Sequence, residues 1–322
     1  MGAGSSIRRS TSSKSNAELV NSLRSNFEAH STPTANGHVN GQVKAANTKV
    51  SHQSWTRLKA GNKTLEVPAI ALNGDNGGLE EEREQYDITL KLFYLPGAPT
   101  KTGDRAAQTR EALGLVLREL QMPSIDLLIV SFPGIYFDES EDCPDKISTR
   151  GPVESEPESI DSQLGTWAAL EDLYDEGLVK KLGIAELGHD RLQTLLEKAR
   201  IKPSVDQINL RDCCSVPKDL LKLAKSKGVE LLVHNDCSNI LPRGTVRELL
   251  GPAPEGAGVL AAPTSTGQKR KSLHGEEAVN GTGVGGLRGE VQPQWVVKYT
   301  AVVMNRGVVE SKGYFAVAEV NE

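Results

Sequence analysis

Polar residues capable of acid-base chemistry stand at the ends of two apolar runs. The run LLIVSF carries Ser131 near its end, and VELLVHND ends with His234 and Asp236 among its last three residues. A buried strand of a parallel sheet that ends in a polar residue directs that residue towards a pocket shared with its neighbours. A histidine and an aspartate at such a strand end are typical of catalysis, although pocket structure or a partner contact would use the same residues.

The elements that must position these residues alternate between strands and helices. Apolar, β-branched runs predict strands at 86–95, 125–132, 179–187, 204–210 and 229–236. Apolar residues at helical spacing predict helices at 109–120, 162–177, 189–200 and 216–228. Gly177 and Gly228 stand where two of these helices end. Further along, 294–307 predicts a helix that ends at Gly307 and is followed by a last strand.

Strands and helices that alternate in this way predict a parallel sheet with helical crossovers. The run at 86–95 begins six such units, and a strand at 64–72 would add a seventh, which favours an α/β fold of the (β/α)8 TIM-barrel type over an open sheet. Residues 1–60 are rich in Ser, Asn, Thr and Lys, so we expect them to be mostly disordered apart from a short helix at AELVNSLRSNFEAH. Residues 61–322 would then form the barrel domain, interrupted by a flexible Gly-rich insertion at 251–290.

The composition excludes several classes of protein. The chain has 322 residues and a formal net charge of −5, so it is long enough for a full core and is not expected to bind nucleic acid. No apolar stretch approaches the roughly 20 residues of a spanning helix, and the polar start lacks a secretory signal, which predicts a cytoplasmic protein. Gly2 and Ser6 fit a myristoylation pattern, which would be its route to a membrane. The four cysteines show no C-x-x-C spacing, so we expect no metal site.

Two stretches resemble the aldo-keto reductase family. TWAALEDLYDEGLVKKLGIAE (166–186) looks like that family's helix and fifth strand, and QWVVKYTAVVMNRGVVESKG (294–313) looks like the helix before its strand eight and the strand itself. The resemblance runs from about residue 86 to about residue 314. It implies a barrel of the aldo-keto reductase type, with a pocket at the carboxyl ends of its strands.

The resemblance also implies which catalytic groups are missing. In the family a tyrosine acts as general acid, a lysine lowers its pKa, an aspartate holds the lysine and a histidine orients the substrate. Lys91 falls at the family's lysine, whereas Ser131 replaces the histidine and cannot carry a positive charge. No stretch before Lys91 resembles the one that supplies the aspartate and the tyrosine. A divergent reductase would need another tyrosine, and Tyr86, Tyr94 and Tyr136 are the candidates.

The positions that hold the nicotinamide cofactor have changed as well. The family's Ser-Asn pair corresponds to Ala185 and Glu186, which places a negative charge where a neutral amide donor belongs. Gln207 is kept, and His234 stands where the family often has a ring stacked on nicotinamide. The chain runs only nine residues past Gly313, too few for the Arg-rich loop and helix that grip the adenosine phosphates. We therefore expect neither NADP nor another cofactor to be bound.

A barrel that keeps its framework and loses its chemistry suggests a non-catalytic subunit. The stretch QINLRDCCSVPKDLLKLAKSKGVELLVHND (207–236), the run TLKLF and the ending MNRGVVESKGYFAVAEV are similar to the regulatory (modifier) subunits of glutamate-cysteine ligase. This resemblance implies a heterodimer with the ligase's catalytic subunit, which joins the γ-carboxyl of glutamate to cysteine with ATP and magnesium. The regulatory subunit would shift the substrate affinity of the catalytic subunit and its feedback inhibition by glutathione.

Several polar residues are candidates for contacts with a partner or for redox chemistry. Cys143 lies in an acidic loop, where it could form an inter-subunit disulfide. Cys213 and Cys214 follow a predicted strand, where a buried thiol is the commoner outcome. Asp236 is a candidate partner contact. The alternatives are a divergent NADP-dependent reductase, which must bind its cofactor, and a free-standing scaffold or redox sensor without a ligase partner.

Overall fold

The computed structural model describes residues 16–31, 50–59, 64–70, 78–137, 155–210, 215–237, 239–252, 256–262 and 286–321. These residues divide into two compact units. The first, which we call the sheet unit, draws on 1–19, 73–242 and 292–319, and the second, the small unit, draws on 20–72, 243–291 and 320–322. In the part of the chain that the structure describes, no helix is long and apolar enough to cross a membrane.

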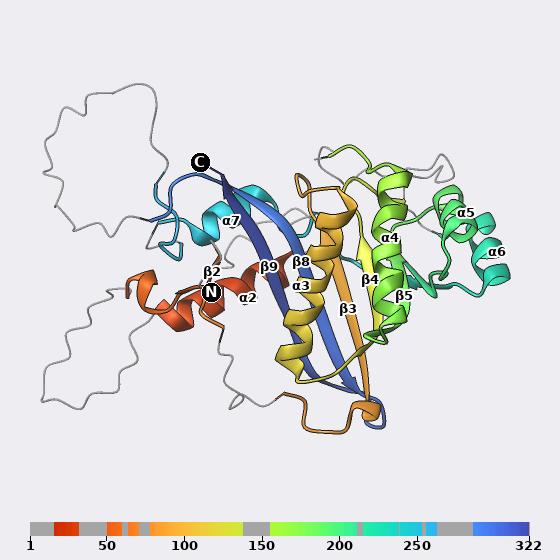
Figure 1. Cartoon of the computed structure of the whole chain (residues 1–322), viewed down its shortest axis with the longest axis horizontal. Helices are drawn as coiled ribbons and strands as arrows, with labels where there is room; N and C mark the ends of the chain where they lie inside the picture. Colours follow the sequence, from red (N-terminus) through yellow and green to blue (C-terminus); the bar gives the residue numbers. More distant parts are fainter. Residues whose placement is uncertain are drawn as a thin grey trace, which may run out of the picture. The chain divides into compact units, whose positions relative to one another are not determined.

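The sheet unit is built around a seven-stranded mixed sheet (Figure 1), in the order β7-β6-β5-β4-β3-β8-β9. The strands from β7 to β3 are parallel. They are β3 (Tyr86–Tyr94), β4 (Ile125–Ser131), β5 (Val179–Ala185), β6 (Val205–Ile208) and β7 (Glu230–Val233). Each lies inside a range that the apolar runs predict, so these five strands are confirmed.

The helices that follow these strands also lie where helical spacing predicts them. They are α3 (Thr102–Leu120), α4 (Ile160–Asp175), α5 (His189–Lys198) and α6 (Lys218–Lys227), and the short η2 (Arg83–Gln85) precedes β3. Gly228 ends α6 in the left-handed region, at φ +70°, which a glycine adopts without strain. Figure 1 shows α3 and α4 side by side across one face of the sheet.

The carboxyl-terminal part differs from the prediction. Residues 294–303, predicted to be helical, lie in β8 (Glu290–Val303), and β9 (Val308–Asn321) follows after a turn. β8 pairs antiparallel with the whole length of β3, from Tyr86–Val303 to Tyr94–Trp295. The segment is rich in β-branched and aromatic residues, which pack well on a pleated strand, and Gly307 at φ +62° lies in a hairpin turn. The helix prediction at 294–307 was therefore wrong.

The described strands form an open sheet, so the predicted closed (β/α)8 barrel is not confirmed. β7 and β9 are the edges of the sheet, whereas a barrel pairs its last strand with its first. The predicted strand at 64–72 is not part of this sheet either. There β2 (Leu65–Glu66) pairs with β1 (Arg57–Leu58) in a separate two-stranded antiparallel sheet. The part of the prediction that is confirmed is the parallel α/β core with helical crossovers, from β3 to β7.

The two faces of the sheet carry different residues. Tyr94 of β3 points towards α3, where its hydroxyl contacts the Thr109 hydroxyl at 2.6 Å. Because side chains alternate along a strand, Lys91 and Phe93 point to the other side. We call the side that packs on α3 the helix face and the other side the Lys91 face.

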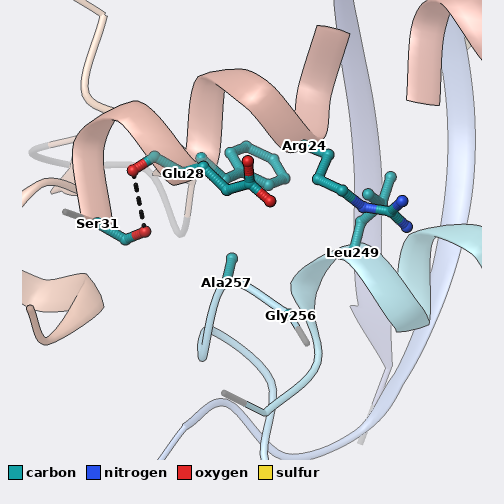
Figure 2. A pocket seen from close by; sticks show the side chains of 7 residues that line it. Arg24, Glu28, Ser31, Leu249, Gly256 and Ala257 are labelled. Carbon is teal, nitrogen blue, oxygen red and sulfur yellow. Dashed lines mark hydrogen bonds between the residues drawn. The ribbon is translucent and has the colours of Figure 1, made fainter. Parts of the chain in front are cut away.

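The small unit contains most of α2 (Ala17–Ser31), the β1-β2 sheet, η1 (His52–Ser54) and α7 (Arg243–Leu250). The short helix expected at AELVNSLRSNFEAH is confirmed as α2. A small cleft in this unit is lined by Arg24, Phe27, Glu28, Ser31, Leu249, Gly256 and Ala257. Figure 2 shows two of these residues, with the Ser31 hydroxyl donating a hydrogen bond to the backbone carbonyl of Glu28. Arg24 already pairs with Glu248 at 3.0 Å, so this cleft offers no unneutralised cation among its lining residues.

Trp167 anchors α4, with its side chain 1 % exposed and its ring N–H donating to the Ile201 carbonyl at 2.8 Å. Trp167→Ala should lower the free energy of unfolding by about 3–5 kcal/mol, because it leaves a cavity in place of a large buried side chain. Tyr174→Ala in the same helix, where the residue is 40 % exposed, should cost less than about 1 kcal/mol. Urea unfolding followed by circular dichroism measures both costs. Equal costs would contradict the burial of this face of α4.

Candidate functional site

The strands bring four predicted pocket residues onto one face. The residue pairs Phe93–Ser131, Ile129–Gly183 and Ala185–Gln207 place Ser131, Ala185 and Gln207 on the same face as Lys91. Ser131 and Ala185 are almost fully buried there. The strands from β3 to β6 thus bring these side chains to one face of the sheet, and the pocket at their carboxyl ends stays a prediction.

The segment after β7 meets Lys91 on the same face. Lys91 Nζ lies 3.3 Å from His234 Nδ1 and 3.3 Å from Asp236 Oδ2. In the sheet order β7 is separated from β3 by β6, β5 and β4, which would be about 19 Å in a flat sheet with strands ~4.8 Å apart. The sheet and the segment after β7 must therefore curl around Lys91, which is 5 % exposed.

A second lysine, which the sequence reasoning missed, shares the same aspartate. Lys298 of β8 pairs directly with Lys91 of β3, and its Nζ lies 3.3 Å from Asp236 Oδ1. Two like charges on directly paired residues repel each other, and the Asp236 carboxylate contacts both. Lys298 was hidden inside the wrong helix prediction; as a strand, QWVVKYTAVV places it on the Lys91 face.

His234 is held by contacts on both ring nitrogens. Nδ1 accepts a hydrogen bond from the backbone N–H of Asp236 at 3.1 Å and faces the Lys91 ammonium, which assigns the ring proton to Nε2. Nε2 lies 2.7 Å from Glu186 Oε1. The carboxylate oxygen lies off the N–H direction, so this contact is a close electrostatic approach rather than a hydrogen bond. The ring is thereby fixed between Lys91 and Glu186.

Glu186 directly follows β5 and has φ +68°, a backbone conformation that residues other than glycine seldom adopt. Its backbone N–H donates to the Gln207 carbonyl at 2.8 Å, and its Oε2 accepts from the Phe137 N–H at 3.0 Å. These two hydrogen bonds hold the turn and aim the carboxylate at His234. Nothing in the sequence predicts a left-handed glutamate, so its role as a structural acceptor came only from the structure.

Burial and charge act in opposite directions on the central ion pair. Burial lowers the pKa of Lys91 from its usual value, and Asp236 and Glu186 offset this only in part. For Asp236 burial acts to raise the pKa, but Lys91 and Lys298 outweigh it and hold the pKa below its usual range. The two directions are compatible because Asp236 faces two cations, whereas Lys91 has lost nearly all of its water. A charged Asp236 is therefore the centre of the cluster.

Asp206 of β6 is buried close by and behaves differently. Burial raises its pKa well above the usual value, and the nearby Glu186 carboxylate adds to the effect. Its Oδ1 accepts from the Leu187 N–H at 3.4 Å, and its Oδ2 has no hydrogen-bond partner within the described residues. Burial therefore favours the protonated form of the Asp206 carboxyl group.

The tyrosines proposed for a divergent reductase do not reach Lys91 from its own strand. Tyr86 and Tyr94 stand an odd number of residues from Lys91 on β3, so they point to the helix face. Tyr136 lies in the loop after β4. Tyr314 of β9, which the sequence reasoning missed, does lie near Asp236, but burial raises its pKa. A general acid activated by a lysine needs a lowered pKa.

The residues present do not fit a nicotinamide cofactor. Gln207 Oε1 is buried without a hydrogen-bond partner in the described part of the chain, and an amide could use it. The Glu186 carboxylate, however, takes the place of the family's neutral amide donor and is held there by the Phe137 N–H. His234 is engaged by Glu186 and Lys91 rather than turned to a ligand. On the Lys91 face, Lys91 contacts His234 and Asp236, and His234 contacts Glu186.

The predicted cysteine contacts cannot be placed, because Cys143, Cys213 and Cys214 lie outside the described residues, as does Gly2. Cys237 is described, and its Sγ lies 3.3 Å from the Asn239 carbonyl oxygen. No group of three or more His, Cys, Asp or Glu side chains in the described ranges could hold a metal ion.

Comparison with known proteins places this arrangement in a family. The profile of the aldo/keto reductase family matches residues 63–239, more than half of the chain. This chain belongs to the aldo/keto reductase family. An aldose reductase of Schistosoma japonicum is similar in structure over 47 % of this chain and 46 % of its own, with 27 % identity and a TM-score of 0.34.

Relatives that cover more of this chain carry a different name. The human glutamate–cysteine ligase regulatory subunit is 25 % identical over 239 residues, which are 74 % of this chain and 68 % of its own. A Schizosaccharomyces pombe protein with the provisional name of a glutamate–cysteine ligase regulatory subunit is 27 % identical over 286 residues, 85 % of this chain and 84 % of its own. The resemblance to regulatory subunits that the sequence motifs predicted is confirmed.

Asp236→Asn should destabilise the protein more than Lys91→Met. The asparagine leaves two ammonium groups without their shared carboxylate, which we expect to cost about 3–5 kcal/mol. Lys91→Met leaves Asp236 paired with Lys298 and removes a buried charge, so it should cost less than about 1 kcal/mol. The double variant should recover part of the loss. Urea unfolding at pH 7 measures all three, and equal costs for the single variants would rule out a shared aspartate.

Asp206→Asn should stabilise the protein increasingly as the pH rises. The pKa of Asp206 is higher in the folded than in the unfolded chain, so its stabilising contribution is complete below the unfolded pKa of about 3.9 and is lost as the pH rises towards the folded pKa. Asparagine keeps the acceptor for the Leu187 N–H and cannot ionise. Urea unfolding from pH 4 to pH 8, with the exposed Asp190→Asn as control, tests this. A constant difference from wild type across that range would show that folding does not raise the pKa of Asp206.

Proposed function

We propose that this chain is a non-catalytic regulatory subunit of glutamate–cysteine ligase. It would bind the catalytic subunit as a heterodimer in the cytoplasm and shift that subunit's affinity for substrate and its inhibition by glutathione. Two observations support the proposal. The regulatory-subunit relatives cover most of the chain, and charged side chains on the face where a reductase would hold its cofactor contact one another.

The proposal needs no catalytic group in this chain. A partner changes an enzyme's affinity for a ligand when it binds the two states of that enzyme unequally, and the coupling is typically 1–3 kcal/mol. That range corresponds to about a 5- to 150-fold change in affinity. A rigid folded domain is sufficient for this, and the curled α/β core with its buried ion pairs supplies one.

The direct test mixes the purified chain with the ligase catalytic subunit. We expect a one-to-one complex by mass, and a concentration of glutathione giving half-inhibition that differs by about 5-fold or more from that of the catalytic subunit alone. Lys91→Met should leave both results unchanged, because Lys91 is a structural charge in this account. The absence of a complex would sink the proposal.

The second candidate function is an NADP-dependent aldo-keto reductase, and family membership favours it. A reductase must bind NADPH before any other step, so quenching of tryptophan fluorescence by NADPH separates the two functions. We expect no saturable quenching. Saturable quenching that Lys91→Met changes, combined with reduction of an aldehyde, would favour the reductase instead.

A further inference from the structure

Glu18, in the first turn of α2, reaches the Lys91 face of the sheet unit. Its Oε1 lies 2.7 Å from Lys312 Nζ of β9. The Tyr314 hydroxyl contacts the same carboxylate, and these contacts, with Lys298 nearby, lower the pKa of Glu18. Leu19, the next residue, also belongs to the sheet unit and is 1 % exposed. A carboxylate from a distant part of the chain is thus bound by two side chains of β9.

The register of β9 shows that these side chains belong to the Lys91 face. Tyr299 pairs with Leu90 on the helix face and stacks on Phe315, with ring centroids 6.1 Å apart. Lys312 and Tyr314 stand an odd number of residues from Phe315, so they point to the other side. They extend the charged cluster of Lys91, Asp236 and Lys298 towards the edge of the sheet.

Charge balance explains why a carboxylate settles there. Lys91, Lys298 and Lys312 carry three positive charges, and Asp236 and Glu186 carry two negative ones. Glu18 supplies the third negative charge. Without it, Lys312 would lose its carboxylate partner beside Lys298 and the Tyr314 hydroxyl, and these donors together attract and hydrogen-bond an anion.

We propose that Lys298, Lys312 and Tyr314 form a binding site for a carboxylate ligand, and that Glu18 occupies this site as an internal competitor. The side chains of Glu18 and Lys312 are 51 % and 64 % exposed, and ion pairs with such exposure are weak and screened by salt. A dicarboxylate, or an acidic side chain on a peptide, can therefore replace Glu18. Asp236 and Lys91 lie deeper and set the inner wall of the site.

The test measures binding of glutarate, a free dicarboxylate, to the full-length chain by isothermal titration calorimetry at low salt. Glu18→Gln should bind glutarate about 5- to 10-fold more tightly than wild type, because a site filled by an internal group has its apparent affinity reduced by the fraction that is open. Glu111→Gln, which removes an exposed carboxylate from α3, is the matched control and should bind like wild type.

The second part of the experiment uses variants of the proposed site itself. In the Glu18→Gln background, Lys312→Gln and Tyr314→Phe should each weaken glutarate binding about 5-fold or more. Lys181→Gln, an exposed lysine near the start of β5, is the control for loss of one positive charge. A 15-residue peptide with the sequence of Ala17–Ser31, added to Glu18→Gln, tests whether an acidic side chain on a helix is the preferred source.

Binding of either glutarate or the peptide, with these variant effects, supports the site and identifies the source of the carboxylate. Equal glutarate affinity in wild type and Glu18→Gln, or binding that survives Lys312→Gln and Tyr314→Phe unchanged, overturns it. No binding of either probe to Glu18→Gln also overturns it. The measurement uses this chain alone, so its failure leaves the proposed regulatory function untouched.

Discussion

Asp236 is the group on which the Lys91 face depends. An isolated ammonium buried as deeply as Lys91 would be strongly disfavoured, and the directly paired Lys298 adds repulsion. Each lysine nitrogen lies 3.3 Å from one oxygen of the Asp236 carboxylate, which resolves both problems at once. Because Asp236 follows β7 at the edge of the sheet while the lysines lie on β3 and β8, this contact also requires the sheet to curl. The contacts of Asp236 with the two lysines therefore depend on the curvature of the sheet.

The same constraint ties the polar residues at the strand ends to one another. Lys91 lies 3.3 Å from Asp236, and the charges of Asp236 and Glu186 offset part of the effect of burial on its pKa. His234 is fixed between Lys91 and Glu186, and the conformation of Glu186 is held by Gln207 and Phe137. Residue types that look catalytic at strand ends act here as mutual partners. Family membership thus fixes the fold while the site decides the function.

The sequence was sufficient to predict the parallel core and not the ends of the sheet. From β3 to β7, the apolar runs and the helical periodicity between them predicted the elements, whereas Lys91, Ala185 and Gln207 were assigned by the resemblance to aldo-keto reductases. Residues 294–303 contain apolar residues compatible with both a helix and a strand, and only the pairing with β3 decides between them. Lys298 was missed as a direct result. Glu18 could not be found at all, because its partner Lys312 is almost the length of the chain away.

An open sheet leaves edges that a closed barrel would not have, and the composition of β9 reflects this. Val308 and Val309 are 56 % and 48 % exposed at the start of this long edge strand. Glu310 and Lys312 follow, and charged residues on an edge strand oppose pairing with another sheet. Both also hold other parts of the chain, since Glu310 accepts from the Tyr86 hydroxyl at 2.8 Å and Lys312 binds Glu18. The charges that protect this edge are therefore the same ones that tie the hairpin to β3 and bring the first turn of α2 to the Lys91 face.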